Sequence, residues 1–309
     1  MKVLVTCPPM LGMIQEFMAP AEALGLELVP AKVTQIMSEE ELISVLPAYD
    51  GWIIGDDPAT RQVFEAGKAG QLKAAVKWGI GVDNVDFAAC RDLGLPIINT
   101  PQMFGGEVAD VALGLLIGLA RSLFVIDRGV HAGIWPKPPG LSLAGKRVGL
   151  IGFGDIGRKL AKRLAACEMQ IVAYDPGSSD DGGVHGLERA AWPERVGEHD
   201  FLVFTCSLNE KNRHMLNAAV LAETKPGVFV VNVARGPLIE EAALVAALRS
   251  GQVQNAALDV FEVEPLPADS PLREFPNCIF GSHNGSNSRD AVRRASHEAL
   301  TRLAGFLHG

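Results

Sequence analysis

The stretch RVGLIGFGDIGRKLAKRLAA, residues 147–166, sets three glycines between a short apolar run and a helical pattern. Their spacing, Gly152-x-Gly154-x-x-Gly157, suits a strand that turns sharply into a helix. The glycines permit the tight turn, let a phosphate approach the backbone and let the helix pack against the strand. The free N–H groups at the start of such a helix bind phosphate oxygens. The stretch, which includes Asp155 and Ile156, therefore predicts the pyrophosphate site of a dinucleotide.

A carboxylate follows at the distance that such a site requires. The run QIVAYD, residues 170–175, is expected to form the next strand, and it ends in Asp175, about 20 residues beyond the glycines. An aspartate there accepts hydrogen bonds from the adenosine ribose hydroxyls and repels a 2′-phosphate. The next residues, Pro176 and Gly177, offer no arginine for such a phosphate. The sequence therefore favours NAD over NADP, with Asp175 and Pro176 in the cofactor site.

Short β-rich runs alternate with helical patterns on both sides of this stretch. The expected strands are 2–6, 26–30, 51–55 and 72–78 in a first series, and 146–154, 170–175, 200–205, 227–234 and 255–261 in a second. Between them, Ser38 and Glu41 match a helix capping box. The residues from Asn287 onward have an apolar side chain at every third or fourth position, which predicts a final amphipathic helix. Strand–helix alternation of this kind indicates parallel sheets covered by helices, an α/β fold.

A long apolar helix is expected at residues 107–123, between the two series. Its most apolar segment is about half the length that spans a bilayer, so we expect it in the core or at a subunit contact. The net charge of −8 gives no broad basic surface for nucleic acid or an anionic membrane. The five cysteines form no CxxC pair or metal-like cluster, and their odd number is a poor basis for disulfides. We expect a cytoplasmic protein without a metal site.

The chain resembles the D-isomer-specific 2-hydroxyacid dehydrogenase family along nearly its whole length. Six motifs carry the resemblance in the family's order: KWGIGVDNVD (77–86), TPQMFGGEVAD (100–110), TCSLNEKNRHMLN (205–217), VNVARGPLIEEAALVAAL (231–248), ALDVFEVEPLP (257–267) and GSHNGSN (281–287). The resemblance implies two Rossmann-like, doubly wound parallel-sheet domains. Residues 1–98 with 287–309 would form a flavodoxin-like substrate domain, and residues 99–286 an NAD-binding domain. It also implies a homodimer through helix 107–123.

The family's catalytic trio falls on Arg235, Glu264 and His283. Arg235 follows an apolar strand, and at a strand end its planar guanidinium can hold a carboxylate through two hydrogen bonds. Spacing alone does not choose between Glu262 and Glu264; the family pattern selects Glu264. His283 stands among small residues that leave room for ligands, and a carboxylate partner would fix its tautomer and favour its protonated form. Glu264→Gln is then expected to shift the pH at which the rate of 2-oxo acid reduction falls to a lower value.

The implied reaction is hydride transfer between NAD(H) and C2 of a small 2-hydroxy or 2-oxo acid, with His283 as acid and base. The resemblance places around the cofactor Cys206, Ser207, Val233, Ala234, Arg235, Asp259 and His283. It places around the substrate Gly79, Ile80, Gly81 and Arg235, with Lys77 either meeting a second anionic group or exposed to solvent. The family usually has proline before the histidine, whereas Ser282 precedes it here and Asn284 follows it, so the loop geometry stays open.

A second class of function also stays open. A dinucleotide-sensing binding protein, like the family's transcriptional corepressors, can retain the trio without turnover. Oxidation of NADH with a panel of 2-oxo acids distinguishes the enzyme from the sensor. The same panel decides between phosphorylated and unphosphorylated substrates, which the sequence does not.

Overall fold

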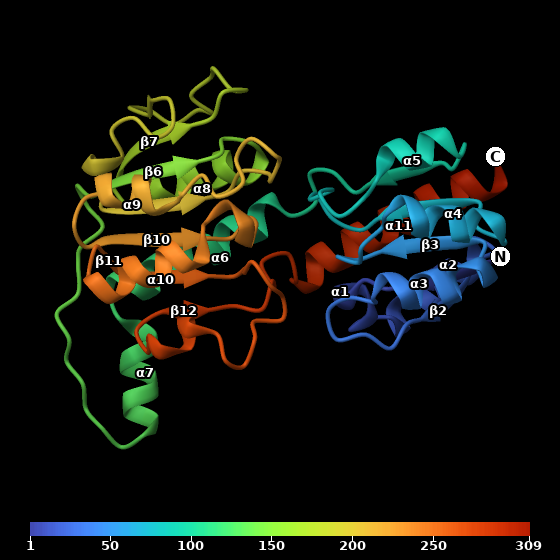
Figure 1. The fold of residues 1–309 in the computed structure, drawn as a ribbon, viewed down its shortest axis with the longest axis horizontal. Coiled ribbons are helices and arrows are strands. Elements are labelled where there is room, and N and C mark those ends of the chain that lie inside the picture. Colours follow the sequence, from blue (N-terminus) through green and yellow to red (C-terminus); the bar gives the residue numbers. More distant parts are fainter. The chain divides into compact units, whose positions relative to one another are not determined.

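The computed structural model describes residues 1–309 and divides the chain into two compact units. Unit 1 comprises residues 1–104 and 287–309, and unit 2 comprises residues 105–286. The sequence placed the first boundary between residues 98 and 99; the structure places it between 104 and 105, where the helix α6 (Gly105–Ala120) begins. Each unit is built on an all-parallel sheet (Figure 1), which confirms the expected fold class.

Unit 1 contains a five-stranded sheet with the strand order β2-β1-β3-β4-β5. The strands are β1 (Lys2–Val5), β2 (Glu27–Pro30), β3 (Gly51–Ile54), β4 (Ala74–Lys77) and β5 (Ile97–Asn99). The first four were expected, whereas the short β5 was not. The chain passes from β1 to β2 on one side and then to β3 on the other, so the winding reverses at the carboxyl end of β1, where open α/β sheets form ligand crevices.

Helices cover both faces of this sheet. One face carries α1 (Pro8–Leu11), α2 (Gln15–Ala23) and α11 (Arg289–His308); the other carries α3 (Glu39–Val45), η1 (Leu46–Ala48), α4 (Arg61–Ala69) and α5 (Phe87–Asp92). The predicted capping box of Ser38 and Glu41 is present at the start of α3. The amphipathic helix expected from Asn287 is α11, and it buries Val292 and Leu303 as its spacing predicts.

Unit 2 contains a seven-stranded parallel sheet with the order β12-β11-β10-β9-β6-β7-β8. The strands are β6 (Arg147–Ile151), β7 (Gln170–Tyr174), β8 (Glu188–Arg189), β9 (Phe201–Phe204), β10 (Val228–Asn232), β11 (Val253–Leu258) and β12 (Ile279–Phe280). The five strands of the second expected series are confirmed; β8 and β12, of two residues each, were not expected. The winding reverses between β6 and β9, so a nucleotide crevice is expected at the carboxyl ends of these strands.

The helices of unit 2 bury the sheet on both sides. They are α6 (Gly105–Ala120), α7 (Leu123–His131), α8 (Asp155–Ala166), α9 (Ala218–Glu223) and α10 (Glu241–Ser250), with the short 3-10 turns η2 (Val196–Glu198), η3 (Gly236–Leu238) and η4 (Pro271–Glu274). The helix α6 packs against α8 and the strands β10 to β12, whereas α9 and α10 pack together.

The long helix expected at residues 107–123 is confirmed as α6, but it ends at Ala120, and the separate helix α7 that follows it was not expected. Ser122 adopts a left-handed φ of 54°, and the two helices bend by 70° at the break. Apolar residues of α6 are buried, whereas α7 has no buried residue. No single helix has the length and apolar character to cross a membrane, and α6 with α7 meets that test only as a bent pair, by length and composition.

Candidate active site

The three residues of the expected catalytic trio follow three neighbouring strands of unit 2. Arg235 comes after β10, Glu264 after β11 and His283 after β12, and these strands are adjacent in the sheet. Because the sheet is parallel, all three residues lie at its carboxyl edge. The fold of unit 2 alone therefore gathers these side chains at one edge of one sheet.

His283 and Glu264 are in direct contact. Nδ1 of His283 lies 2.7 Å from Oε2 of Glu264, and both side chains are 21% exposed. The other carboxylate oxygen of Glu264 accepts the N–H of Phe261 at 2.9 Å, which fixes the carboxylate on its own loop. Of the two carboxylates that spacing left as alternatives, Glu264 contacts His283, whereas Glu262 lies 2.6 Å from His214. A carboxylate on Nδ1 holds the ring in one orientation and leaves proton exchange to Nε2.

The histidine loop, residues 281–285, is organised by Asp259 at the end of β11. The two oxygens of its buried carboxylate accept the N–H groups of Asn284 (3.1 Å) and Gly285 (2.8 Å), and its carbonyl accepts that of His283 (2.6 Å). A Cβ on Gly281 would lie 2.1 Å from Oδ1 of Asp259, so only glycine allows this approach. Burial raises the pKa of the Asp259 carboxyl above its usual value. The small residues around His283 thus let the loop wrap around a buried carboxylate.

Arg235 lies on a turn that Asn232 braces. The Asn232 amide donates to the carbonyl of Arg235 (2.9 Å) and accepts the N–H of Ala234 (3.0 Å). The guanidinium of Arg235 donates to the carbonyl of Ala234 at 2.8 Å. Asn232 was not expected to matter, and its position as the last residue of a buried strand, immediately before the arginine turn, was the available signal.

The glycine-rich turn forms as predicted between β6 and α8. A Cβ on Gly157 would lie 2.2 Å from the carbonyl oxygen of Gly152, and Gly152 itself has a φ of +101° and lies against Cys206. Gly154 faces open space, with nothing within 4 Å of a Cβ placed there, and α8 begins without a side-chain cap. Its first N–H groups are thus available to phosphate oxygens. The turn has the shape and donors that the dinucleotide phosphates of NAD require.

Asp175 ends β7 beside this turn. Its carboxylate accepts the N–H of Phe153 at 2.6 Å and the N–H of Gly177 at 2.8 Å. The same region holds an arginine that sequence reasoning did not consider: Arg158 stacks on the Phe153 ring and donates to Asp180 and to Ser178. Its guanidinium is thus already paired with a carboxylate beside the glycine turn.

Three further residues expected at the cofactor, Asp155, Cys206 and Ser207, make local contacts around the glycine turn. Asp155 begins α8 and pairs with Lys159 at 2.9 Å, while its second oxygen is buried without a hydrogen-bond partner. Burial raises the pKa of the Cys206 thiol to about 12, so this cysteine is no nucleophile near neutral pH. The carbonyl of Ser207 accepts the Asn212 amide at 2.7 Å.

In unit 1 the expected substrate residues surround the end of β4. Gly79 has a φ of +141° and its N–H donates to the Thr100 hydroxyl at 2.9 Å, so this amide already has a partner. The ammonium of Lys77 is buried and contacts Asp56 at 3.0 Å and the carbonyl of Gly55. Of the two alternatives that the sequence left open for Lys77, the solvent-exposed one is therefore wrong.

Comparisons with known proteins identify the family of this chain. A model of the "D-isomer specific 2-hydroxyacid dehydrogenase, NAD binding domain" matches residues 113–285. A hydroxypyruvate reductase of Thermotoga maritima is 36% identical over 273 residues, covering 86% of this chain and 88% of the relative. A D-3-phosphoglycerate dehydrogenase of Methanocaldococcus jannaschii is 33% identical and covers 92% of this chain; the chain spans 54% of that relative, about half its length.

Solved structures match both units. A protein of Thermus thermophilus superposes with a TM-score of 0.86 at 30% identity, covering 100% of this chain and 97% of its own. The apo D-lactate dehydrogenase of Escherichia coli gives 0.85 at 26% identity, covering 99% and 96%. The relatives named here as reductases and dehydrogenases give no support to the alternative of a dinucleotide-sensing binding protein. The chain belongs to the D-isomer specific 2-hydroxyacid dehydrogenase family and is an NAD-dependent dehydrogenase.

Proposed function

We propose that the chain reduces the C2 carbonyl of a small 2-oxo acid and, in reverse, oxidises the 2-hydroxy acid, with His283 as the acid and base. The observation that carries the proposal is the 2.7 Å contact between Nδ1 of His283 and Glu264. Bound NAD supplies or accepts the hydride. The Gly152–Gly157 turn and Asp175 would hold it, with Cys206, Val233 and Asp259 beside it.

His283 and Glu264 perform the proton chemistry. With Nδ1 directed at the carboxylate, Nε2 holds the proton that passes to the carbonyl oxygen during reduction and receives the hydroxyl proton during oxidation. The Glu264 carboxylate favours the imidazolium, so the protonated form needed for reduction persists to higher pH than it would for an unpaired histidine. Reduction should therefore decline at higher pH, once the imidazolium loses its proton.

Recognition of the acid is assigned to Arg235 of unit 2 and, separately, to the loop after β4 of unit 1. The guanidinium of Arg235 would bind the substrate carboxylate through paired hydrogen bonds and polarise the neighbouring carbonyl. The amides of Ile80 and Gly81 would supplement it, whereas that of Gly79 already donates to Thr100. Lys77, engaged with Asp56, would shape this loop or meet a second anionic group of the substrate.

The test is NADH oxidation over a panel of plain and phosphorylated 2-oxo acids, followed by variants on the best substrate. His283→Asn should lower kcat about 100- to 10,000-fold, the usual contribution of a general acid. Glu264→Gln should shift the falling limb of the reduction profile to lower pH, because an amide stabilises the imidazolium less. No turnover with any acid, or a Glu264→Gln profile that differs only in height, would contradict the assignment.

A homodimer is the second part of the proposal. The sequence predicted the contact on residues 107–123, but α6 is largely buried within unit 2, so we propose it on α7 and the loop after it instead. Six of the large exposed apolar side chains fall within residues 123–141: Leu123, Phe124, Val130, Ile134, Trp135 and Leu141. Such a concentration of apolar surface usually marks a protein contact, and a second copy of the same chain in a two-fold dimer is the commonest partner among soluble oligomers. Trp135→Ser, which alters a side chain that is 75% exposed, should shift light scattering from the dimer mass to the monomer mass. A wild-type protein whose mass by light scattering is already that of the monomer would refute the dimer.

A cytoplasmic location is the third part of the proposal, and it rests on the cysteines. All five cysteines are unpaired, which suits a reducing interior such as the cytoplasm.

A further inference from the structure

A second histidine–glutamate pair lies beside the catalytic one. Nε2 of His214 is 2.6 Å from Oε1 of Glu262, in the same loop as Glu264. Nε2 of His214 forms no hydrogen bond, so the two side chains make a close polar contact without one. His214 has a φ of 53° and His283 a φ of 55°. Non-glycine residues rarely adopt this conformation unless their surroundings hold them there.

The backbone around His214 is tied to the segment that follows Arg235. The N–H of His214 donates to the carbonyl of Pro237 at 2.8 Å, and the N–H of Leu216 donates to that of Leu238 at 3.1 Å. In return, the N–H of Glu240 donates to the carbonyl of Leu216 at 3.0 Å. Residues 214–216 therefore run alongside residues 237–240.

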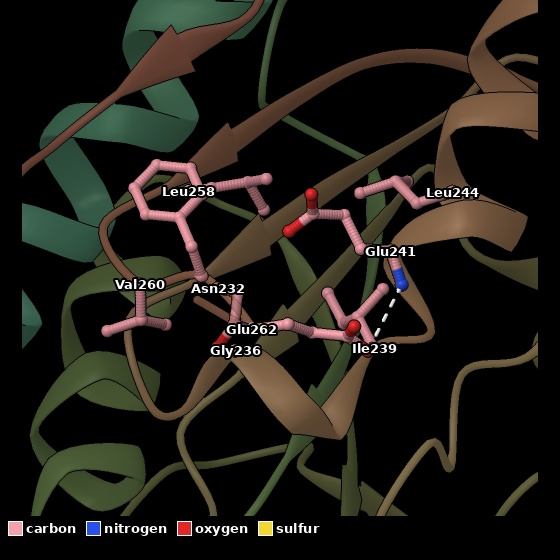
Figure 2. A pocket seen from close by; sticks show the side chains of 9 residues that line it. Asn232, Gly236, Ile239, Glu241, Leu244, Leu258, Val260 and Glu262 are labelled. Carbon is pink, nitrogen blue, oxygen red and sulfur yellow. Dashed lines mark hydrogen bonds between the residues drawn. The ribbon is translucent and has the colours of Figure 1, made fainter. Parts of the chain in front are cut away.

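The Glu262 carboxylate also reaches the start of α10. The N–H of Glu241 lies 3.4 Å from Oε1 of Glu262, whereas the preceding residue, Glu240, provides no side-chain cap. A carboxylate at a helix N-terminus interacts favourably with the unpaired N–H groups and the helix dipole. Figure 2 shows Glu241 and Glu262 lining one small pocket at the start of α10. Burial raises the pKa of the Glu241 carboxyl.

The two catalytic loops touch at Gly236. A Cβ on this residue would lie 1.9 Å from the carbonyl carbon and oxygen of Phe261 and 2.4 Å from the nitrogen of Glu262. The turn that follows Arg235 thus packs directly on the backbone that leads to Glu264. Glu262 stands at this junction and contacts both neighbouring segments through one carboxylate.

We propose that His214 and Glu262 are positioning residues that clamp the loop 261–264 onto the turn 235–241. The clamp keeps Glu264 within bonding distance of His283 and holds Arg235 at its strand end. The proposal rests on the proposed function, because it assigns the pair a role only through Arg235, Glu264 and His283.

The test compares Glu262→Gln, His214→Asn and the double variant in the intact enzyme. Asparagine tolerates a positive φ better than most residues, so His214→Asn removes the imidazole with little backbone strain. Glu210→Gln and His185→Ala, at exposed positions of the same unit, are the matched controls. The readouts are kcat, KM and the pH profile for the best 2-oxo acid, NADH affinity by fluorescence, and Tm.

Each single variant should lower kcat about tenfold, since small displacements of catalytic groups are costly, and the controls should not. The falling limb of the reduction profile should move to lower pH, in the direction of Glu264→Gln, while the Kd for NADH stays within about twofold, a difference under 0.5 kcal/mol. The double variant should be no worse than the poorer single variant, because the two residues act as one unit.

A lower Tm with unchanged kcat and an unmoved limb would overturn the proposal, since a purely structural contact gives that result. The Glu264→Gln variant distinguishes failure of the proposed function from failure of the clamp. If its own limb does not move, the proposed function fails; if it moves and both clamp variants match wild type, only the clamp fails. Should Glu262→Gln not fold, His214→Asn decides alone, because that side chain is 36% exposed and its replacement leaves the core intact.

Discussion

Acid should destabilise unit 2 through one buried histidine, His199. Its side chain is fully buried, and Nε2 lies 2.6 Å from the hydroxyl of Tyr174, which donates its own proton to the carbonyl of Glu194 at 2.7 Å. The ring must therefore carry its hydrogen on Nε2, an assignment made from the network. Nδ1 is left buried without a partner. Protonation would place a charged N–H in that site, and burial accordingly lowers the pKa of His199 to about 4.

The size of the effect follows from proton linkage. In the unfolded chain the same imidazole titrates near pH 6.5. Between pH 6.5 and the folded value, the unfolded chain binds a proton that the folded one refuses, so stability is full above this window and falls as pH drops through it. The two pKa values give a loss of about 2 kcal/mol between pH 7 and pH 5, and about 3 kcal/mol by pH 4.

The measurement is urea unfolding at pH 7 and pH 5, for wild type and for His199→Gln. Glutamine keeps an N–H donor for Tyr174 but does not titrate. Trp192, whose ring centroid is 5.3 Å from that of Tyr174, makes fluorescence a local probe of the region. The variant should lose about 2 kcal/mol less than wild type between the two pH values, since all other groups titrate alike. Equal losses in both proteins would refute the reasoning.

Three further outcomes are expected. Gly157→Ala should weaken NADH binding about tenfold, because its Cβ would lie 2.2 Å from the Gly152 carbonyl and overpacking of this size costs about 1–3 kcal/mol; unchanged affinity in a fluorescence titration would contradict the turn geometry. Asp175→Asn should weaken NADH about tenfold, the worth of a charge-assisted hydrogen bond, and narrow the preference over NADPH; a variant that weakens both cofactors equally would argue against repulsion of the 2′-phosphate. Lys77→Ala should raise KM by the same factor for phosphorylated and plain 2-oxo acids, because its ammonium is engaged with Asp56; a loss confined to phosphorylated acids would show that it meets the phosphate.

The parts of the fold that the sequence predicts are those with a local cause. The glycine turn, the capping box at Ser38 and the long buried strands all depend on spacing within a few residues, and the structure confirms them. The strands that sequence reasoning missed, β5, β8 and β12, have only two or three residues each and carry too little pattern. The break at Ser122 was missed because the apolar pattern continues across it; a left-handed residue leaves no trace in hydrophobic periodicity.

At the candidate site, the sequence predicted which residues matter but not which of their side chains are in contact. Spacing could not separate Glu262 from Glu264, because both precede apolar or proline residues in one extended loop; the contacts with His214 and His283 separate them. Sequence reasoning likewise could not find Asp259 as the support of the histidine loop, since its bonds to Asn284 and Gly285 cross from one strand end to the next. Such links depend on strand order, which motif spacing does not encode.

The succession of Arg235, Glu264 and His283 along β10, β11 and β12 has an evolutionary consequence. All three belong to residues 105–286, so the proposed acid–base pair and the proposed carboxylate-binding arginine are encoded in a single continuous stretch of chain. The loops proposed to select the acid belong to the other unit. New substrate preferences can then arise by exchange or drift of residues 1–104 without rebuilding the acid–base chemistry, which makes unit 1 the natural target for chimeras that change specificity.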